Sequence, residues 1–131
     1  MSRLMRASVL FLLSVTATVG CAHTHSLGPA YIFFSRSDQP EIELRSYSFS
    51  PDHLVILDDH SPVTLRLINI ADTGHNFTLL DPEKGVIVSK NLNSEESATI
   101  SLNSLGKGNY VFYCNRFRHR HRGMEGMLMI D

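Results

Sequence analysis

The sequence lacks an excess of basic charge, a long apolar segment and any internal repeat. Its 131 residues hold 12 Lys and Arg against 13 Asp and Glu, a formal net charge of −1. A protein that binds nucleic acid is basic overall, so that class is excluded. The one extended apolar stretch, residues 7–19, is shorter than the roughly 20 residues of a membrane-spanning helix. No segment keeps a helical period of apolar residues, which argues against a helical fold.

Cysteine is scarce as well, since the chain contains only two cysteines, Cys21 and Cys114. Residues 1–20 have a basic start, an apolar stretch and a small residue before the break, which is the pattern of an export signal. The motif Thr18-Val19-Gly20-Cys21 resembles the lipobox of bacterial lipoproteins, so we expect residues 1–20 to be a signal peptide and lipid on Cys21 to anchor the protein to a membrane. The alternative is ordinary secretion with Cys21 incidental. Ala22 replaces the aspartate that retains some lipoproteins at the inner membrane, so we expect a periplasmic protein on the outer membrane.

Lipid on Cys21 would leave Cys114 without a disulfide partner. A lone thiol outside the cytoplasm is open to oxidation unless it is buried or bound to a metal ion. Removal of the signal peptide also takes away Arg3 and Arg6, which leaves ten basic and 13 acidic residues, a net charge of −3. Four of those basic residues lie together between residues 116 and 122, so the charge is segregated along the chain.

The rest of the chain has the pattern of short β-strands. Residues 21–40 read as a tether that contains a brief apolar run at residues 31–34, which could form a first strand. Farther on, Val63, Leu65 and Leu67 alternate with polar residues, as expected for a strand with one buried face. Many short strands at even spacing, separated by turn-rich segments, predict a β-sandwich or barrel. We therefore expect one all-β domain over residues 41–131.

Tyr110 follows Gly108 by two residues at the start of a late strand. This is the composition of a tyrosine corner, in which the hydroxyl bonds to the backbone upstream and holds a connection in place. The alternative is a plain aromatic residue within the strand.

Four side chains that bind metal ions can be grouped in the sequence. His75 follows a turn and begins a strand. Cys114 ends an aromatic strand, and His119 and Met124 follow it at five-residue steps. Two imidazoles, a thiolate and a weak thioether are the ligands of a blue-copper site, because sulfur suits Cu(I) and imidazole suits Cu(II). We therefore predict one type 1 copper ion, with His75 arriving from a different strand.

At these positions the sequence resembles the cupredoxin family, which includes azurin, plastocyanin, auracyanin and rusticyanin. The resemblance rests on GHNF at residues 74–77, YVFYC at residues 110–114 and HRHRGMEGMLMI from His119. The spacing from Cys114 to His119 and Met124 is similar to that of rusticyanin and auracyanin. The resemblance implies a Greek-key β-sandwich that carries electrons and is not an enzyme. It also implies that Asn76 hydrogen-bonds near the thiolate and supports the site from outside the ligand set.

The segment between Cys114 and His119 departs from the family, in which proline or small apolar residues are usual. Here it reads Asn-Arg-Phe-Arg, and a second histidine, His121, follows two residues after His119. His119 keeps the family spacing and is the preferred ligand, with His121 as the alternative.

The arginines of this segment are Arg116, Arg118, Arg120 and Arg122. We expect them to surround the copper ligand nearest the surface, where positive charge disfavours Cu(II) and so raises the redox potential. The same charge would attract a redox partner that is acidic at its docking surface, and the association would depend on salt. The alternative is a solvated basic loop without a docking role.

Together these patterns predict a membrane-anchored blue copper protein that carries single electrons outside the cytoplasm. Two alternatives remain open. The chain could store or deliver copper, which would show as transfer of the ion to a chelator. It could also be a metal-free β-sandwich that serves as a binding module, in which case added Cu(II) would give no intense visible absorption.

Overall fold

The computed structural model describes residues 26–34, 39–57 and 63–131. Its strands are β1 (Tyr31–Phe34), β2 (Glu41–Arg45), β3 (Ser48–Ser50), β4 (His53–Leu57), β5 (Thr64–Asn69), β6 (His75–Leu80), β7 (Val86–Leu92), β8 (Ser97–Ser101), β9 (Gly108–Tyr113) and β10 (Glu125–Ile130). One turn of 3-10 helix, η1 (Arg120–Arg122), precedes β10. The expected signal peptide and Cys21 lie outside the described residues. Within the described ranges, no helix has the length and hydrophobicity to cross a membrane.

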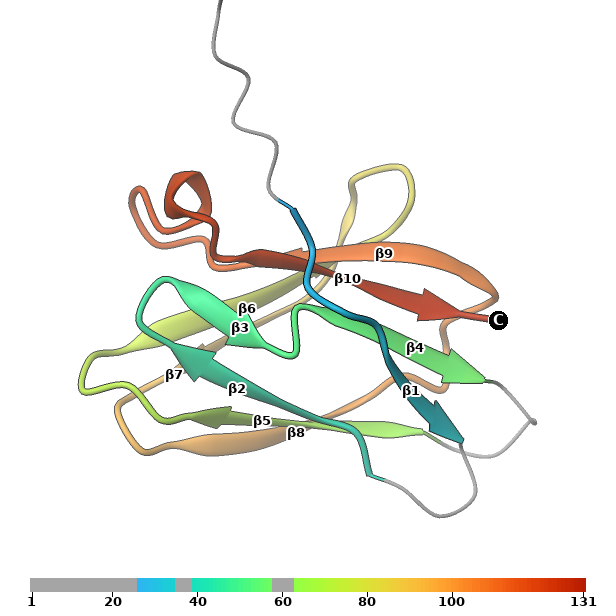
Figure 1. The fold of residues 1–131 in the computed structure, drawn as a ribbon, viewed down its shortest axis with the longest axis horizontal. Helices are drawn as coiled ribbons and strands as arrows, with labels where there is room; N and C mark the ends of the chain where they lie inside the picture. Colours follow the sequence, from blue (N-terminus) through green and yellow to red (C-terminus); the bar gives the residue numbers. More distant parts are fainter. Residues whose placement is uncertain (1–25, 35–38, 58–62) are drawn as a thin grey trace, which may run out of the picture.

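The strands form two sheets that pack face to face as a sandwich (Figure 1). The larger sheet has the order β1-β4-β10-β9-β6-β7, and the smaller has the order β3-β2-β5-β8. Strands β1 and β10 each pair in parallel with β4, and β2 pairs in parallel with β5, so the chain crosses repeatedly from one sheet to the other. The predicted fold class, an all-β Greek-key sandwich in one domain, is therefore confirmed.

Alternating hydrophobicity explains how most strands lie on the core. In β5, Leu65 and Leu67 are fully buried, whereas Thr64 and Arg66 are exposed. Strands β2 and β10 alternate in the same way. Burial of each such leucine contributes about 1.5–3 kcal/mol, so the period-two pattern fixes which face of the strand turns inward.

Strand β6 departs from this alternation because all six of its residues are buried. It lies between β7 and β9 inside the larger sheet. Its Phe77 stacks on Phe112 of β9 with ring centroids 5.2 Å apart, and Phe49 of the smaller sheet meets both rings edge-on. These three rings join the two sheets directly behind the end of the sandwich at which β6 begins.

The tyrosine corner is present. The hydroxyl of Tyr110 donates a hydrogen bond to the carbonyl oxygen of Gly106 at 2.7 Å. Gly108, between them, has a φ of +149°, which favours glycine over other residues. The bond ties the β8–β9 connection to the start of β9.

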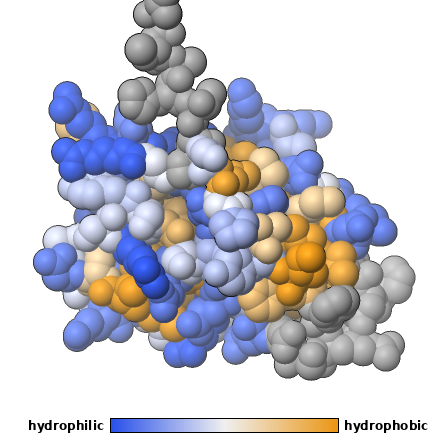
Figure 2. Space-filling model, viewed as in Figure 1, coloured by the Kyte–Doolittle hydropathy of each residue, from blue (hydrophilic) through white to orange (hydrophobic). Residues whose placement is uncertain are grey.

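The apolar run at residues 31–34 forms β1 at one edge of the larger sheet. Just ahead of it, the N–H of Gly28 donates to the carboxylate of Asp52 at 3.0 Å, so this segment packs against the domain. Tyr31 and Ile32 are more than half exposed. Figure 2 shows an apolar area over β1 and β4, whereas hydrophilic side chains cover the end that carries the β9–β10 loop.

Candidate metal centre

Three connections meet at one end of the sandwich: the β2–β3 turn, the β5–β6 turn and the β9–β10 loop (Figure 1). His75 is the first residue of β6, and Cys114 directly follows β9. His119 lies just before η1, and Met124 just before β10. The strand ends thus deliver all four predicted ligands to the same end of the molecule.

Main-chain hydrogen bonds close the β9–β10 loop. The N–H of Cys114 donates to the carbonyl of Met124 at 3.0 Å, and the N–H of Met124 donates to the carbonyl of His119 at 3.1 Å. The N–H of His119 in turn donates to the carbonyl of Arg116 at 3.1 Å. Gly123 has a φ of +96°, a left-handed conformation that suits glycine and turns the chain into β10. Met124 is therefore held directly opposite Cys114.

His75, Cys114 and His119 come together in the structure. One ligand atom from each residue lies within 4.8 Å of the other two. Cys114 Sγ and His119 Nδ1 are 3.4 Å apart, and the two imidazole centroids are 5.1 Å apart. Cys114 is a free thiol, and both it and Met124 are fully buried. The alternative ligand, His121, is exposed on η1 and lies outside the cluster.

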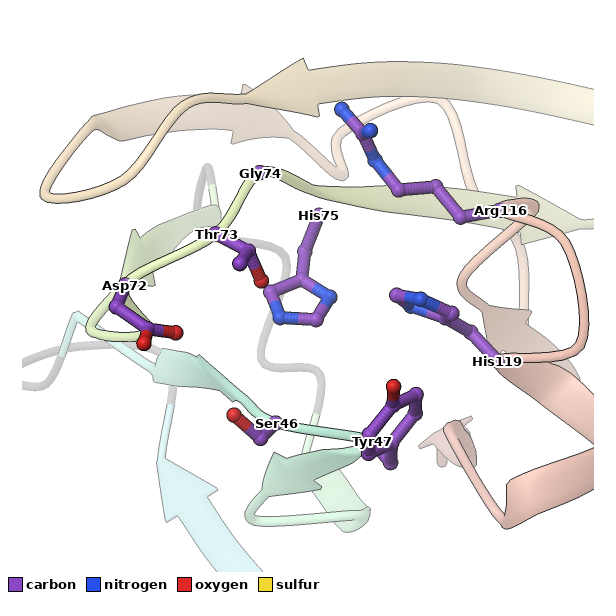
Figure 3. A pocket seen from close by; sticks show the side chains of 8 residues that line it. All are labelled: Ser46, Tyr47, Asp72, Thr73, Gly74, His75, Arg116 and His119. Carbon is purple, nitrogen blue, oxygen red and sulfur yellow. The ribbon is translucent and has the colours of Figure 1, made fainter.

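The imidazole of His75 is suited to bind a metal ion because its ring nitrogens make no hydrogen bond to the described part of the chain. The residue is 1% exposed, and neither ring nitrogen has a hydrogen-bond partner among the described residues. An unpaired buried polar group costs about 1–3 kcal/mol, which a metal ion could offset by taking up a lone pair. Figure 3 shows one ring nitrogen of His75 turned toward His119 across the space between the two rings. The two imidazoles and the thiol are a donor set that suits copper.

The pKa of each imidazole is lowered, which favours the neutral form with the lone pair that a metal ion needs. Burial lowers the pKa of His75, the positive charges of His119 and Arg116 lower it further, and Asp72 opposes them. Burial also lowers the pKa of His119, with added effects from Arg116 and Arg122. The lowered pKa values mean that fewer protons compete for the lone pairs of the two rings.

A cleft of about 360 Å³ opens beside the two rings (Figure 3). It is lined by Ser46, Tyr47, Asp72, Thr73, Gly74, His75, Arg116 and His119. Of the three clustered ligands, His119 alone is partly exposed. Its ring is thus the part of the site nearest to solvent.

Comparison with known proteins agrees with this geometry. The sequence matches the family described as "Cupredoxin-like domain" over residues 9–130. The chain belongs to this family. No curated protein sequence matches the chain.

Several solved structures share the cupredoxin fold. An auracyanin from the photosynthetic bacterium Roseiflexus castenholzii, reduced with dithionite, is 16% identical; the match covers 81% of this chain and 99% of that one, with a TM-score of 0.61. Reduced rusticyanin is 15% identical over 78% of this chain and 84% of its own, with a TM-score of 0.58. A purple cupredoxin from Nitrosopumilus maritimus is 20% identical over 70% and 99% of the two chains, with a TM-score of 0.54. At these identities the likeness shows the fold.

In this cupredoxin, Asn76 connects the thiol to the strands around it. Its backbone N–H donates to Cys114 Sγ at 3.3 Å. Its side-chain oxygen accepts from the N–H of Asn115 at 3.3 Å and from the hydroxyl of Thr78 at 2.6 Å. Its side-chain amide donates to Ser89 and Asn91 of β7. Asn76 therefore lies where the resemblance implied, and it couples β6, β7 and the start of the ligand loop.

Asn69 also supports the site, and only its place at a strand end could have pointed to it from the sequence. The residue is fully buried at the end of β5. Its side-chain amide donates to the carbonyls of Thr73, Leu92 and Asn93 at 2.8 to 3.2 Å, and its side-chain oxygen accepts from the N–H of Ala71 at 3.0 Å. These bonds hold the β5–β6 turn, and with it the start of β6 at His75.

Three of the four arginines between residues 116 and 122 lie over aromatic rings. The pairs are Arg118 with Phe117, Arg120 with Tyr113 and Arg122 with Tyr47, at 5.3, 4.4 and 4.4 Å from guanidinium carbon to ring centroid. Arg120 also forms an ion pair with Glu125 at 2.7 Å. Arg116 reaches back over Gly74, where a Cβ would approach its Nη2 to 2.8 Å. Each exposed cation–π contact contributes about 0.5–1 kcal/mol, which helps to offset repulsion among the four charges.

Proposed function

We propose that this cupredoxin carries single electrons by means of one type 1 copper ion bound by His75, Cys114, His119 and Met124. The observation that supports the proposal is the convergence of two imidazoles and a thiol within 4.8 Å, around a buried His75 whose nitrogens are unpaired. Bound copper would supply a one-electron couple between Cu(I) and Cu(II). The chain itself would position the donors and keep bulk water from the thiol.

The burial of the donors favours an electron carrier over a copper-delivery protein. Cys114 and Met124 are fully buried and His75 is nearly so, whereas His119 reaches the cleft. An ion held in this way leaves only when the β9–β10 loop moves, but an electron can pass through the partly exposed ring of His119. On the same reasoning, the chain acts as a carrier and not as an enzyme.

The test is addition of Cu(II) to the metal-free protein, followed by visible absorption. We expect an intense band from the bond between thiolate and copper, loss of that band in Cys114→Ser, and a near-wild-type band in His121→Ala as the matched control. His119→Ala should change the spectrum strongly. A colourless wild-type protein would favour the metal-free binding module.

Retention of the ion distinguishes electron transfer from copper delivery. The loaded protein would be cycled with ascorbate and ferricyanide in the presence of a Cu(I) chelator. An electron carrier keeps its band through many cycles, because its buried donors exchange slowly. Rapid transfer of copper to the chelator would favour delivery instead.

We also propose that the arginine segment attracts an acidic redox partner, with unequal contributions from its members. Arg120 is compensated by Glu125, and Arg116 is folded over Gly74. Arg118 has no carboxylate partner among the described residues and lies beside Phe117, which is 86% exposed. Arg118 is therefore the arginine best placed to meet a partner.

Two small oxidants, one anionic and one cationic, can test the attraction by these arginines when the partner is not known. We expect Arg118→Gln to slow oxidation of the reduced protein by ferricyanide several-fold at low salt and to leave oxidation by a cationic cobalt phenanthroline complex unchanged or faster. Arg66→Gln, on β5 away from the loop, is the control. Equal rates for wild type and Arg118→Gln with both oxidants would contradict the steering role.

Export and lipid attachment at Cys21 stay part of this proposal and rest on the N-terminal sequence. Fractionation of cells should place the protein in the outer-membrane fraction, and Cys21→Ser should release it into the soluble periplasm. A wild-type protein that is soluble and carries no lipid by mass spectrometry would argue for ordinary secretion.

A further inference from the structure

The ring of Tyr47 packs against the predicted ligand His119 at the mouth of the cleft (Figure 3). The two ring centroids are 4.8 Å apart and the ring planes meet at 67°, which is an edge-to-face contact. The guanidinium carbon of Arg122 lies 4.4 Å from the centroid of the same tyrosine ring. This contact joins the β2–β3 turn to the β9–β10 loop.

Tyr47 is the one aromatic contact of His119, in the described part of the chain, that comes from outside the ligand set. The imidazole also meets groups of the ligand set: Cys114 Sγ lies 3.4 Å from Nδ1, and the ring of His75 lies 5.1 Å away between centroids. Main-chain hydrogen bonds fix the backbone of His119, but they do not fix the torsions of its side chain. The orientation of this imidazole in the metal-free protein therefore depends on Tyr47.

The backbone of Tyr47 indicates that its side chain has a role. The residue has a φ of +61°, in the left-handed region where glycine and asparagine are common and a bulky residue is strained. It occupies the two-residue turn between β2 and β3. Phe49, two residues later, packs on Phe112 with centroids 5.1 Å apart, so the hairpin is fixed to the core. A strained aromatic residue that is fixed in this way beside a ligand points to function.

We propose that Tyr47, held by Arg122, is a positioning residue that keeps His119 Nδ1 directed at the thiol of Cys114. The proposal rests on the proposed copper site. Because the His119 ring is oriented before the ion arrives, copper binding does not have to order it, and the affinity for copper is higher. Loss of an aromatic contact of this kind should weaken copper binding roughly three- to tenfold.

Four variants distinguish the effect of the Tyr47 ring from the effects of the β2–β3 turn and of the Arg122 charge. Tyr47→Asn removes the ring and keeps a residue that suits the left-handed turn, whereas Tyr47→Phe keeps the ring and removes the hydroxyl. Arg122→Gln removes the cation over the ring. Arg118→Gln removes the same charge from the same loop, but its guanidinium lies over Phe117 instead and it serves as the matched control.

Three measurements are made on each full-length variant. Nitrogen-15 NMR of the metal-free protein reports the order of the His119 ring. Competition with a chromophoric Cu(I) chelator gives the copper affinity. Urea unfolding gives the stability of the fold, so that a loss of affinity can be told from a loss of folding.

For Tyr47→Asn we expect a urea midpoint no lower than that of wild type, averaged His119 ring signals, and a dissociation constant for Cu(I) raised three- to tenfold. Tyr47→Phe should match wild type, and Arg122→Gln should lie between wild type and Tyr47→Asn. Arg118→Gln should change the His119 ring signals and the Cu(I) affinity less than Arg122→Gln does. Unchanged ring signals and affinity in Tyr47→Asn would overturn the proposal, as would an equal loss in Tyr47→Phe. If wild type binds no copper, the proposed function fails, and the spectra of the metal-free proteins still decide the role of Tyr47.

Discussion

Replacement of His75 by leucine should stabilise the metal-free protein, although it removes a ligand from the proposed metal site. The imidazole is buried and both nitrogens lack partners, so each contributes an unpaired polar group to the folded state. Removal of such a group should raise the free energy of unfolding by about 1–3 kcal/mol. Imperfect packing of the leucine, whose volume is similar, should lower it by up to about 1.5 kcal/mol. We expect metal-free His75→Leu to be more stable than wild type by about 1–2 kcal/mol at pH 7.

The advantage of His75→Leu should grow in acid, because the folded state lowers the pKa of His75. The unfolded imidazole has a pKa of about 6.5, so below that pH the unfolded state of wild type binds more protons than the folded state. Titration of His75 therefore leaves the stability of wild type unchanged above about pH 6.5 and lowers it as the pH falls through that value toward the lower pKa of the folded state. His119 also has a lowered pKa, but it is present in both proteins, so the difference between them isolates His75.

Urea unfolding from pH 5 to pH 8, with and without copper, is the assay. His121→Leu, at an exposed position, is the control and should change stability by less than about 0.5 kcal/mol. With copper at 100 times the dissociation constant, wild type should gain about 2.7 kcal/mol and become the more stable of the two. A metal-free His75→Leu that is less stable than wild type at pH 7, or an advantage that does not grow in acid, would refute the reasoning.

Three further substitutions test the packing that carries the site. Asn69→Ala removes the amide that holds the β5–β6 turn, so the free energy of unfolding should fall by about 2–3 kcal/mol in urea titration. The affinity for Cu(I) should fall as well, and an unchanged affinity would show that the turn does not position His75. Gly126→Ala brings a Cβ against the carbonyl oxygen of Asp52, so we expect a loss of at least about 3 kcal/mol or no cooperative unfolding by circular dichroism, and a stable variant would contradict that close approach. Tyr110→Phe removes the corner hydrogen bond and should lower the thermal midpoint by an amount equivalent to about 1 kcal/mol, whereas an unchanged midpoint would mean that the bond does not contribute.

The ligand loop could be predicted because its residues are close in the sequence. Cys114, His119 and Met124 are separated by five-residue steps at the end of a strand, which is enough chain for a single closed turn. The donor chemistry then required another imidazole, and His75 at a strand start supplied it. The alternation of Leu65 and Leu67 with polar neighbours likewise predicted a half-buried strand, because that pattern is local and its period belongs to β-structure.

Contacts between segments distant in the sequence could not be predicted where neither partner belongs to a ligand motif or where the partner is not a ligand. Tyr47 reaches His119, and Asn69 reaches the carbonyls at the end of β7, only because the two sheets are placed in one particular register. The arginine segment could be recognised as basic, but its rings come from three places: Tyr47 in a turn, Tyr113 in β9 and Phe117 in the loop itself. Register and layer packing decide such pairs, and single-sequence periodicity does not contain them.

The complete burial of Cys114 has a consequence for the protein before it acquires metal. A thiol with no exposed surface cannot meet hydrogen peroxide or a second copy of itself, so neither a sulfenic acid nor a cross-linked dimer forms readily while the fold is intact. If the protein binds copper outside the cytoplasm as proposed, its metal-free form would keep the thiol reduced while folded, and the rate of thiol oxidation would be set by how often the fold opens.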